Sequence, residues 1–122
     1  MQCFSIRQPW AALILYGPKR IENRSRLTRY RGPVLIHAGK TLDKRADLSA
    51  IPPGVPVHCG FIIGVAELVD CRPYAACVGL PYARGPWCWF LDSVRAFDKP
   101  IRWRGALSFF RVPDEVVADA IG

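Results

Sequence analysis

Long apolar runs, closely spaced cysteine pairs and a secretory leader pattern are all missing from this sequence. No apolar run approaches the roughly 20 residues that a membrane-spanning helix needs, so we expect no membrane association. The opening MQCFSIRQPW lacks a basic region followed by an apolar stretch and a small-residue cleavage site. These absences predict a soluble, cytoplasmic protein.

Metal-binding patterns are also lacking. The sequence has only two histidines, His37 and His58, and an odd number of cysteines with no CxxC pair. Their spacings match no common zinc pattern, and two of the cysteines lie in apolar, strand-like runs. We therefore expect reduced thiols, no metal and no cofactor. The cysteines are Cys3, Cys59, Cys71, Cys77 and Cys88.

The length of 122 residues suits a single domain over residues 1–122, and half of the residues are apolar, enough for a core. Strands are expected over 3–6, 20–25, 33–38, 61–70, 87–97 and 101–112. Gly64 predicts a bulge or a close backbone approach. Strands dominate and lie too close together for repeated βαβ units. This pattern predicts an α+β fold built on a small, partly closed barrel of about five to six strands.

Helices are expected over 8–17, after the first strand, over 41–50, after the third, and over 113–121, at the C-terminus. In the first, Pro9 suits the opening helical position and Gly17 suits the residue just past the end. An apolar face at helical spacing predicts that one side of this helix meets the core. That face consists of Trp10, Leu13 and Ile14.

Positive charge exceeds negative charge, with 17 Lys and Arg against 10 Asp and Glu. Residues 19–31 contain six basic residues and one acid, whereas residues 113–122 contain three acids and no base. Clustered positive charge is typical of a protein that binds a polyanion, although a basic surface with no partner is equally compatible. The six basic residues are Lys19, Arg20, Arg24, Arg26, Arg29 and Arg31.

The segment GPKRIENR, residues 17–24, begins this cluster. The alternation of strand side chains predicts that Glu22 and Arg24 share one face. Lys19 precedes the strand and is able to fold back toward them. From these residues alone, an exposed salt bridge contributing under about 1 kcal/mol is the simplest interpretation.

The same segment carries the pattern G-x-K-x-x-E-x-R, formed by Gly17, Lys19, Glu22 and Arg24. Three more blocks follow in order: RYRGPVLIHAGK, GVAELVDC and WFLDSVRAFDKPIRWRGALSFFRVP. Together with SIRQPWA, they resemble the ASCH domain, a branch of the PUA-like superfamily. The likeness covers nearly the whole chain and extends to small stand-alone bacterial ASCH proteins and to the ASCH module of a human transcriptional coactivator.

The resemblance implies a PUA-like β-barrel with a cleft beside the helix that ends at Gly17, and a role connected with RNA or another nucleic acid. Some members resemble RNA-binding modules, one is described as a ribonuclease, and a bacterial branch deacetylates N4-acetylcytidine. In that branch a threonine nucleophile stands where this chain has Glu22, and Glu67 is an insecure match for its later catalytic glutamate. Deacetylation is therefore the less expected activity.

The resemblance places Lys19, Glu22 and Arg24 along the cleft. In a binding module, the two cations would hold phosphate or a base edge, and Glu22 would accept hydrogen bonds from base or sugar. In a hydrolase, Lys19 would act as a base and Glu22 would orient or activate water. The flanking residues that we expect to contact the ligand are Gln8, Trp10, Arg26, Arg29 and Arg31.

Other side chains have two open interpretations. The tryptophans at 87, 89 and 103 are typical of a core, although one could stack on a base. His37 could reach the cleft or be a hydrogen-bonded structural residue, and Ser5 could lie on the cleft floor.

The sequence thus favours a nucleic-acid-binding module whose ligand is RNA or a modified nucleotide. The alternatives are a hydrolase on the same cleft, either a ribonuclease or an amidohydrolase, and a protein-interaction module whose basic face meets an acidic partner.

Overall fold

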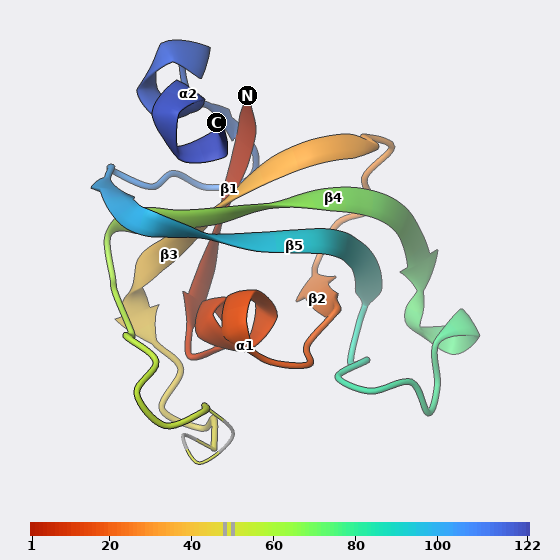
Figure 1. Ribbon diagram of the computed structural model, residues 1–122. Helices are drawn as coiled ribbons and strands as arrows, with labels where there is room; N and C mark the ends of the chain where they lie inside the picture. The colour runs from red at the N-terminus through yellow and green to blue at the C-terminus, as the bar shows by residue number, and fades with distance from the viewer. Residues whose placement is uncertain (48, 50) are drawn as a thin grey trace.

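A six-stranded mixed sheet with one helix against each face forms the framework of the computed structural model, which describes residues 1–47, 49 and 51–122 (Figure 1). The strand order is β2-β5-β4-β3-β1-β6. The strands are β1 (Gln2–Gln8), β2 (Ile21–Arg24), β3 (Gly32–Leu42), β4 (Phe61–Pro73), β5 (Trp87–Arg102) and β6 (Phe110–Arg111). The helices are α1 (Trp10–Tyr16), η2 (Tyr74–Ala76, a 3-10 turn) and α2 (Asp114–Ile121).

The predicted α+β class, the number of strands and the first and last helices are confirmed. The sheet does not close into a barrel, because β2 and β6 remain its two edges. β1 pairs with β3 in parallel, and the other neighbouring strands pair antiparallel. The PUA-like arrangement is therefore an open, curved sheet over the described residues.

Three of the predicted elements differ from the structure. The helix expected over 41–50 is replaced at its start by the end of β3, where Leu42 pairs with Gln8 of β1. Residues 44–46 form a turn and a bend, and residues 48 and 50 lie outside the described residues. The strand expected to end at residue 97 continues to Arg102 as part of β5. The strand expected over 101–112 is interrupted, because residues 103–109 are irregular and only Phe110–Arg111 form the next strand, β6.

The alternation of strand side chains divides the core between the two faces of the sheet. Phe4 and Ile36 pack with Ile14 of α1 on one face. Cys3 and Leu35 pack on the other face. Val117 of α2 belongs to that second cluster, which also contains Phe97 and Val112. Each of these two helices thus covers a layer of buried apolar side chains. Figure 1 shows α1 and α2 on opposite sides of the sheet.

Gly64 sets how closely α1 approaches the sheet. A Cβ at this position would lie 2.1 Å from Leu15 Cδ1 and 2.6 Å from the Arg95 carbonyl oxygen. The expected close approach is therefore confirmed, and only glycine leaves room for the helix here. Among the described residues, no helix is both long and apolar enough to cross a membrane.

Candidate functional site

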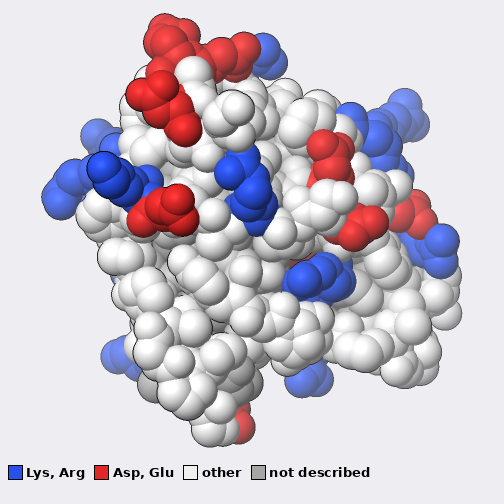
Figure 2. All heavy atoms as spheres, viewed as in Figure 1, with Lys and Arg blue, Asp and Glu red and all other residues white. Residues whose placement is uncertain are grey.

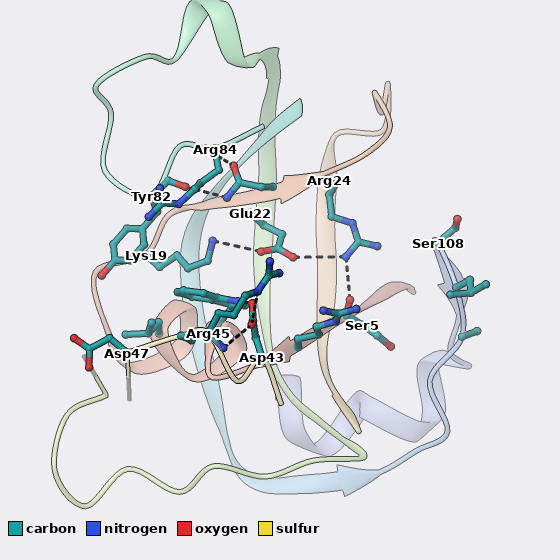
Figure 3. A pocket seen from close by; sticks show the side chains of 17 residues that line it. Ser5, Lys19, Glu22, Arg24, Asp43, Arg45, Asp47, Tyr82, Arg84 and Ser108 are labelled. Atoms are coloured by element: carbon teal, nitrogen blue, oxygen red, sulfur yellow. Dashed lines mark hydrogen bonds and ion pairs between the residues drawn. The ribbon is translucent and has the colours of Figure 1, made fainter. Parts of the chain in front are cut away.

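Three charged side chains form a row on the floor of a pocket beside α1 and β2 (Figure 3). Lys19 Nζ lies 3.3 Å from Glu22 Oε1, and Arg24 Nη1 lies 3.6 Å from Glu22 Oε2. Glu22 and Arg24 share a face because they occupy alternate positions of β2. The carboxylate of Glu22 is therefore held between two cations, and only 10% of this side chain is exposed.

Lys19 is almost completely buried, with 2% of its surface exposed. Its ammonium donates a hydrogen bond to the Ile21 carbonyl and lies 5.8 Å from the Trp10 ring and 5.7 Å from the Tyr82 ring. Burial lowers the pKa of Lys19 below its ordinary 10.5, whereas the Glu22 carboxylate acts in the opposite direction. A buried ammonium needs such partners, because an isolated buried charge is strongly disfavoured.

Arg24 is oriented from several sides. Its Nη1 donates to the Ser5 carbonyl at 3.0 Å, and its guanidinium lies 5.2 Å from the Phe4 ring and 5.4 Å from the Trp89 ring. Aromatic faces attract a guanidinium electrostatically, so these rings restrict its direction without consuming its remaining N–H donors. Arg24 is thus positioned before any ligand arrives.

The pocket has a volume of about 930 Å³ and is bounded by segments far apart in the sequence. Its walls come from β1, α1 and β2 and from residues 43–47, 82–84 and 106–108. Three exposed arginines stand among its lining residues, namely Arg7, Arg45 and Arg84. We call these three arginines the rim and the Lys19–Glu22–Arg24 row the floor.

Asp43 fixes one wall of the pocket. Its carboxylate accepts a hydrogen bond from Trp10 Nε1 at 3.1 Å and lies 3.5 Å from Arg45 Nε. The hydrogen bond from Trp10 is the main cause that lowers the pKa of Asp43 below its ordinary value. Asp43 therefore stays charged and holds the indole of Trp10 against the pocket.

Asn23 fixes the opposite wall. Its Nδ2 donates to the Tyr82 carbonyl at 2.9 Å, and its Oδ1 accepts from the backbone N–H groups of Arg84, at 2.8 Å, and Gly85, at 2.9 Å. The irregular segment that carries Tyr82 and Arg84 is thereby tied to β2. Because its amide is occupied by backbone groups, Asn23 contributes to the shape of the pocket more than to ligand contacts.

The six basic residues between 19 and 31 do not form one surface. Lys19 and Arg24 face the pocket floor, whereas Arg20 Nη1 donates to the carbonyls of Ile14, Gly17 and Lys19 at 2.9–3.1 Å. A cation near the last carbonyls of a helix is favourable, so Arg20 caps α1. Figure 2 shows blue side chains spread over the visible face, with the acidic side chains of α2 gathered at one end.

Arg26, Arg29 and Arg31 are exposed and lie outside the pocket lining. Arg31 donates to the Thr28 and Tyr30 carbonyls and lies 3.8 Å from the Asp70 carboxylate. These contacts stabilise the local turn that contains Arg31. The structure therefore does not bring these three arginines together with the floor, and a contact between them and a ligand in the pocket remains a prediction.

Gln8 also lies outside the pocket lining, and its expected contact with the ligand stays a prediction. The side chain is fully buried: its Nε2 donates to the His58 carbonyl at 2.7 Å and its Oε1 accepts from the Ala12 N–H at 3.0 Å. The amide thus satisfies an N–H group in the first turn of α1 and joins it to the 52–60 segment. Trp10, two residues later, does line the pocket.

His37 is buried behind the pocket and not within its lining. Its Nε2 lies 2.7 Å from the Trp103 carbonyl and its Nδ1 lies 2.9 Å from Ser5 Oγ. The carbonyl can only accept, so Nε2 carries the proton and Nδ1 accepts from the Ser5 hydroxyl. Burial lowers the pKa of His37. His37 therefore ties β1 to the segment that leads to residues 106–108 of the pocket wall.

Of the other residues considered from sequence, Ser5 lines the pocket, whereas Trp87, Trp103 and Glu67 do not. Trp89 is 5% exposed and stacks on Phe109 with ring centroids 5.3 Å apart, which makes it a core residue. All five cysteines are free thiols, and Cys59 is exposed. Within the described residues, no group of three or more His, Cys, Asp or Glu side chains is arranged to hold a metal ion.

Sequence reasoning did not identify the rim arginines or the wall residues Asp43 and Tyr82. These residues lie in irregular segments or at a strand end, and no local pattern indicates that such segments converge. The one available signal was the turn-forming composition of residues 79–86, rich in Gly and Pro, which indicates a loop but not its position.

The fold and this pocket define a small α+β module with a charged pocket beside α1 and β2 of an open sheet. A sequence model of the ASCH domain matches residues 4–101 of the 122. The chain therefore belongs to the ASCH domain family, which is PUA-like.

Similar proteins include activating signal cointegrator 1 from Homo sapiens and from Mus musculus. Each is 31% identical to this chain over an alignment of 83 residues, and the match covers 57% of this chain and 14% of the relative. The match thus covers only a small part of those proteins.

Solved structures of an ASCH protein from Zymomonas mobilis share the fold. The crystal structure of ASCH from this organism superimposes with a TM-score of 0.62 and covers 98% of this chain and 92% of that chain at 13% identity. A point mutant of the same protein, ZmASCH, gives a TM-score of 0.66, with 98% and 95% of the two chains covered at 13% identity. The overall arrangement of the elements is therefore one already seen in this family.

Proposed function

We propose that this ASCH domain binds nucleic acid, RNA or a modified nucleotide, in the pocket between α1 and β2. One observation carries the proposal. The Lys19–Glu22–Arg24 row, in which Lys19 and Glu22 are buried and Arg24 is partly exposed, forms the floor of a cavity of about 930 Å³ whose rim carries three exposed arginines.

Floor and rim suit different parts of a nucleotide. Exposed guanidinium groups attract phosphate through their charge and release counterions from the strand. A desolvated row of donors and acceptors is suited to a base edge, which is how proteins read unpaired bases in single-stranded RNA. The rings of Trp10 and Tyr82 supply apolar surface in the same pocket, and an RNA-related role is what the ASCH resemblance implies.

The test measures the binding of short, unpaired RNA and DNA oligonucleotides by fluorescence anisotropy at several salt concentrations. We expect affinity to fall as salt rises, and the double variant Arg45→Ala with Arg84→Ala to bind about tenfold less tightly at low salt. Arg111→Ala, at an exposed position on β6 outside this pocket, serves as the charge-matched control for the single variant Arg84→Ala. No binding at low salt, or an equal effect of Arg111→Ala, would overturn the proposal.

A hydrolase that uses the same pocket is the second candidate. The observation that favours it is the lowered pKa of Lys19 beside a nearly buried carboxylate, a combination typical of functional sites. In this mechanism Lys19 would take a proton from the attacking hydroxyl or water, and Glu22 would orient that nucleophile.

Incubation with RNA and, separately, with N4-acetylcytidine tests this candidate. Cleavage or deacetylation that Lys19→Ala abolishes in a folded variant would establish catalysis. If both substrates stay intact at protein concentrations that saturate binding, the hydrolase candidate is disproved and only the binding function stands.

A further inference from the structure

The floor presents its hydrogen-bonding groups in a fixed order. Figure 3 shows the Lys19 ammonium, the Glu22 carboxylate and the Arg24 guanidinium side by side, joined by the two ion pairs. An ammonium and a guanidinium can only donate, and an ionised carboxylate can only accept. The order across the floor is therefore donor, acceptor, donor.

Three neighbouring polar groups do not change this order, because each already has a partner. The Asn23 amide is occupied by the backbone of residues 82–85. Asp43 is engaged by Trp10 and Arg45, and the Ser5 carbonyl accepts from Arg24. Glu22 thus supplies the acceptor at the centre of the row, and each flanking cation retains N–H groups beyond those already used.

One nucleobase edge complements this row. The edge formed by O2, N3–H and O4 of uracil or thymine offers acceptor, donor, acceptor. Its N3–H would donate to Glu22, and its two carbonyl oxygens would accept from Lys19 and Arg24. Hydrogen bonds with a charged partner are the stronger class, which favours recognition by three charged groups in a desolvated pocket.

The other bases mismatch at one or more positions. Cytosine would place its unprotonated N3 against the carboxylate and its amino group against a cation. Adenine would place N1 against the carboxylate in the same way. Guanine matches at O6 and N1–H, but its amino group would face the second cation. A mismatch leaves buried charged groups unpaired, and this cost is what produces discrimination.

We infer that the pocket selects bases with an imide edge, uracil in RNA or thymine in DNA, through the Lys19–Glu22–Arg24 floor. The inference rests on the proposed function, because it requires that an unpaired base enters this pocket. Selection comes from the floor, whereas the rim arginines would contact the backbone of any strand equally.

The experiment compares short homopolymers of U, dT, C and A and a U homopolymer methylated at N3, each titrated into the intact protein at one moderate salt concentration. We expect the U and dT strands to bind about 10- to 100-fold more tightly than the C and A strands. Methylation at N3 removes the donor that faces Glu22, so the methylated strand should lose the same factor. The dT arm separates base recognition from recognition of the ribose 2′-hydroxyl.

Two variants assign the preference to the carboxylate. Glu22→Gln keeps the shape of the side chain but adds a donor, so the preference for U over C should fall to about threefold or less. Glu115→Gln on α2, outside the pocket, should leave the preference unchanged. Circular dichroism checks that both variants fold.

The outcomes separate the two proposals. If all homopolymers bind with equal, salt-dependent affinity, the selectivity is disproved and the nucleic-acid function stands. If C or A binds best, or if N3-methylation has no effect, the assignment of Glu22 is wrong. If no strand binds, the proposed function and the selectivity both fail.

Discussion

The floor and the rim of the pocket are both charged, but they are built in opposite ways. On the floor, Lys19 is 2% exposed and Arg24 is held by a backbone carbonyl and two aromatic rings. At the rim, the arginine side chains are exposed, and Arg45 forms an ion pair while 87% of its side chain remains accessible. Fixed, desolvated groups can discriminate between ligands, whereas exposed charges mainly attract them.

The largest expected effect comes from removing the central carboxylate of the floor. Glu22→Ala leaves the buried Lys19 ammonium without its charged partner, so we expect the free energy of unfolding to fall by about 3–5 kcal/mol. Urea denaturation followed by circular dichroism measures this loss. Glu115→Ala, at an exposed position on α2, should change stability by less than about 0.5 kcal/mol.

A double variant tests the cause of that loss. In Lys19→Met with Glu22→Ala no buried ammonium is left unpaired, so this protein should be more stable than Glu22→Ala alone. If the double variant is less stable than the single one, the charge of Lys19 is not what makes the floor sensitive.

His37, which is buried behind the pocket, predicts that the stability of the protein depends on pH. Burial lowers the pKa of His37 in the folded protein below its ordinary value of 6.5. The stability that the neutral ring contributes is therefore present above about pH 6.5 and lost as pH falls through the lowered pKa, by up to about 1.4 kcal/mol per pH unit. Urea denaturation over the acid range measures the slope.

His37→Gln and His58→Gln form a matched pair for this experiment. In His37→Gln the free energy of unfolding should depend less steeply on pH than in the wild type. The reason is that residue 37 then has no ring to take up a proton, whereas His37 bonds to Ser5 and Trp103 in the wild type. The second should leave the slope nearly intact. Equal slopes in His37→Gln and wild type would show that another group causes the acid sensitivity.

The parts predicted correctly depended on periodicity and on steric rules. Alternation along residues 20–25 placed Glu22 and Arg24 on one face, and their 3.6 Å ion pair agrees with it. The close approach expected at Gly64 is also present. Such features depend only on neighbouring residues in one element, so a local pattern is sufficient to reveal them.

The errors arose where tertiary contacts outweigh local propensity. Residues 41–42 continue β3 because β1 offers a partner strand. β5 continues past residue 97 and through Pro100, where it lies beside β4 alone, since β2 reaches no further than residue 90 along β5. The missing N–H of a proline is tolerated on such an unpaired edge. The pocket walls had no local signal because they come from irregular segments brought together by the sheet.

Replacing arginine by lysine compares floor and rim directly. Arg24→Lys keeps the charge but loses the planar fork and its contacts with Phe4 and Trp89. We expect about a tenfold loss of oligonucleotide affinity, because a charge-assisted hydrogen bond contributes about 1.5–3 kcal/mol. Arg84→Lys at the rim should change affinity by less than about twofold, since point charge is sufficient there. Equal losses in the two variants would remove the distinction between floor and rim.

The smallest effect is expected outside the pocket, at Arg29. This residue belongs to the same basic stretch as Arg24 in the sequence, but it is exposed and lies outside the pocket lining. We expect Arg29→Ala to change affinity by less than about twofold and to leave the salt dependence unchanged, measured by anisotropy beside Arg24→Ala. If the strand continues from the pocket over the 25–31 segment, the slope of log K against log salt would instead decrease in magnitude by about 0.7. That result would extend the binding surface to the basic loop, and charge in the sequence would then have indicated the path of the ligand more faithfully than the pocket does.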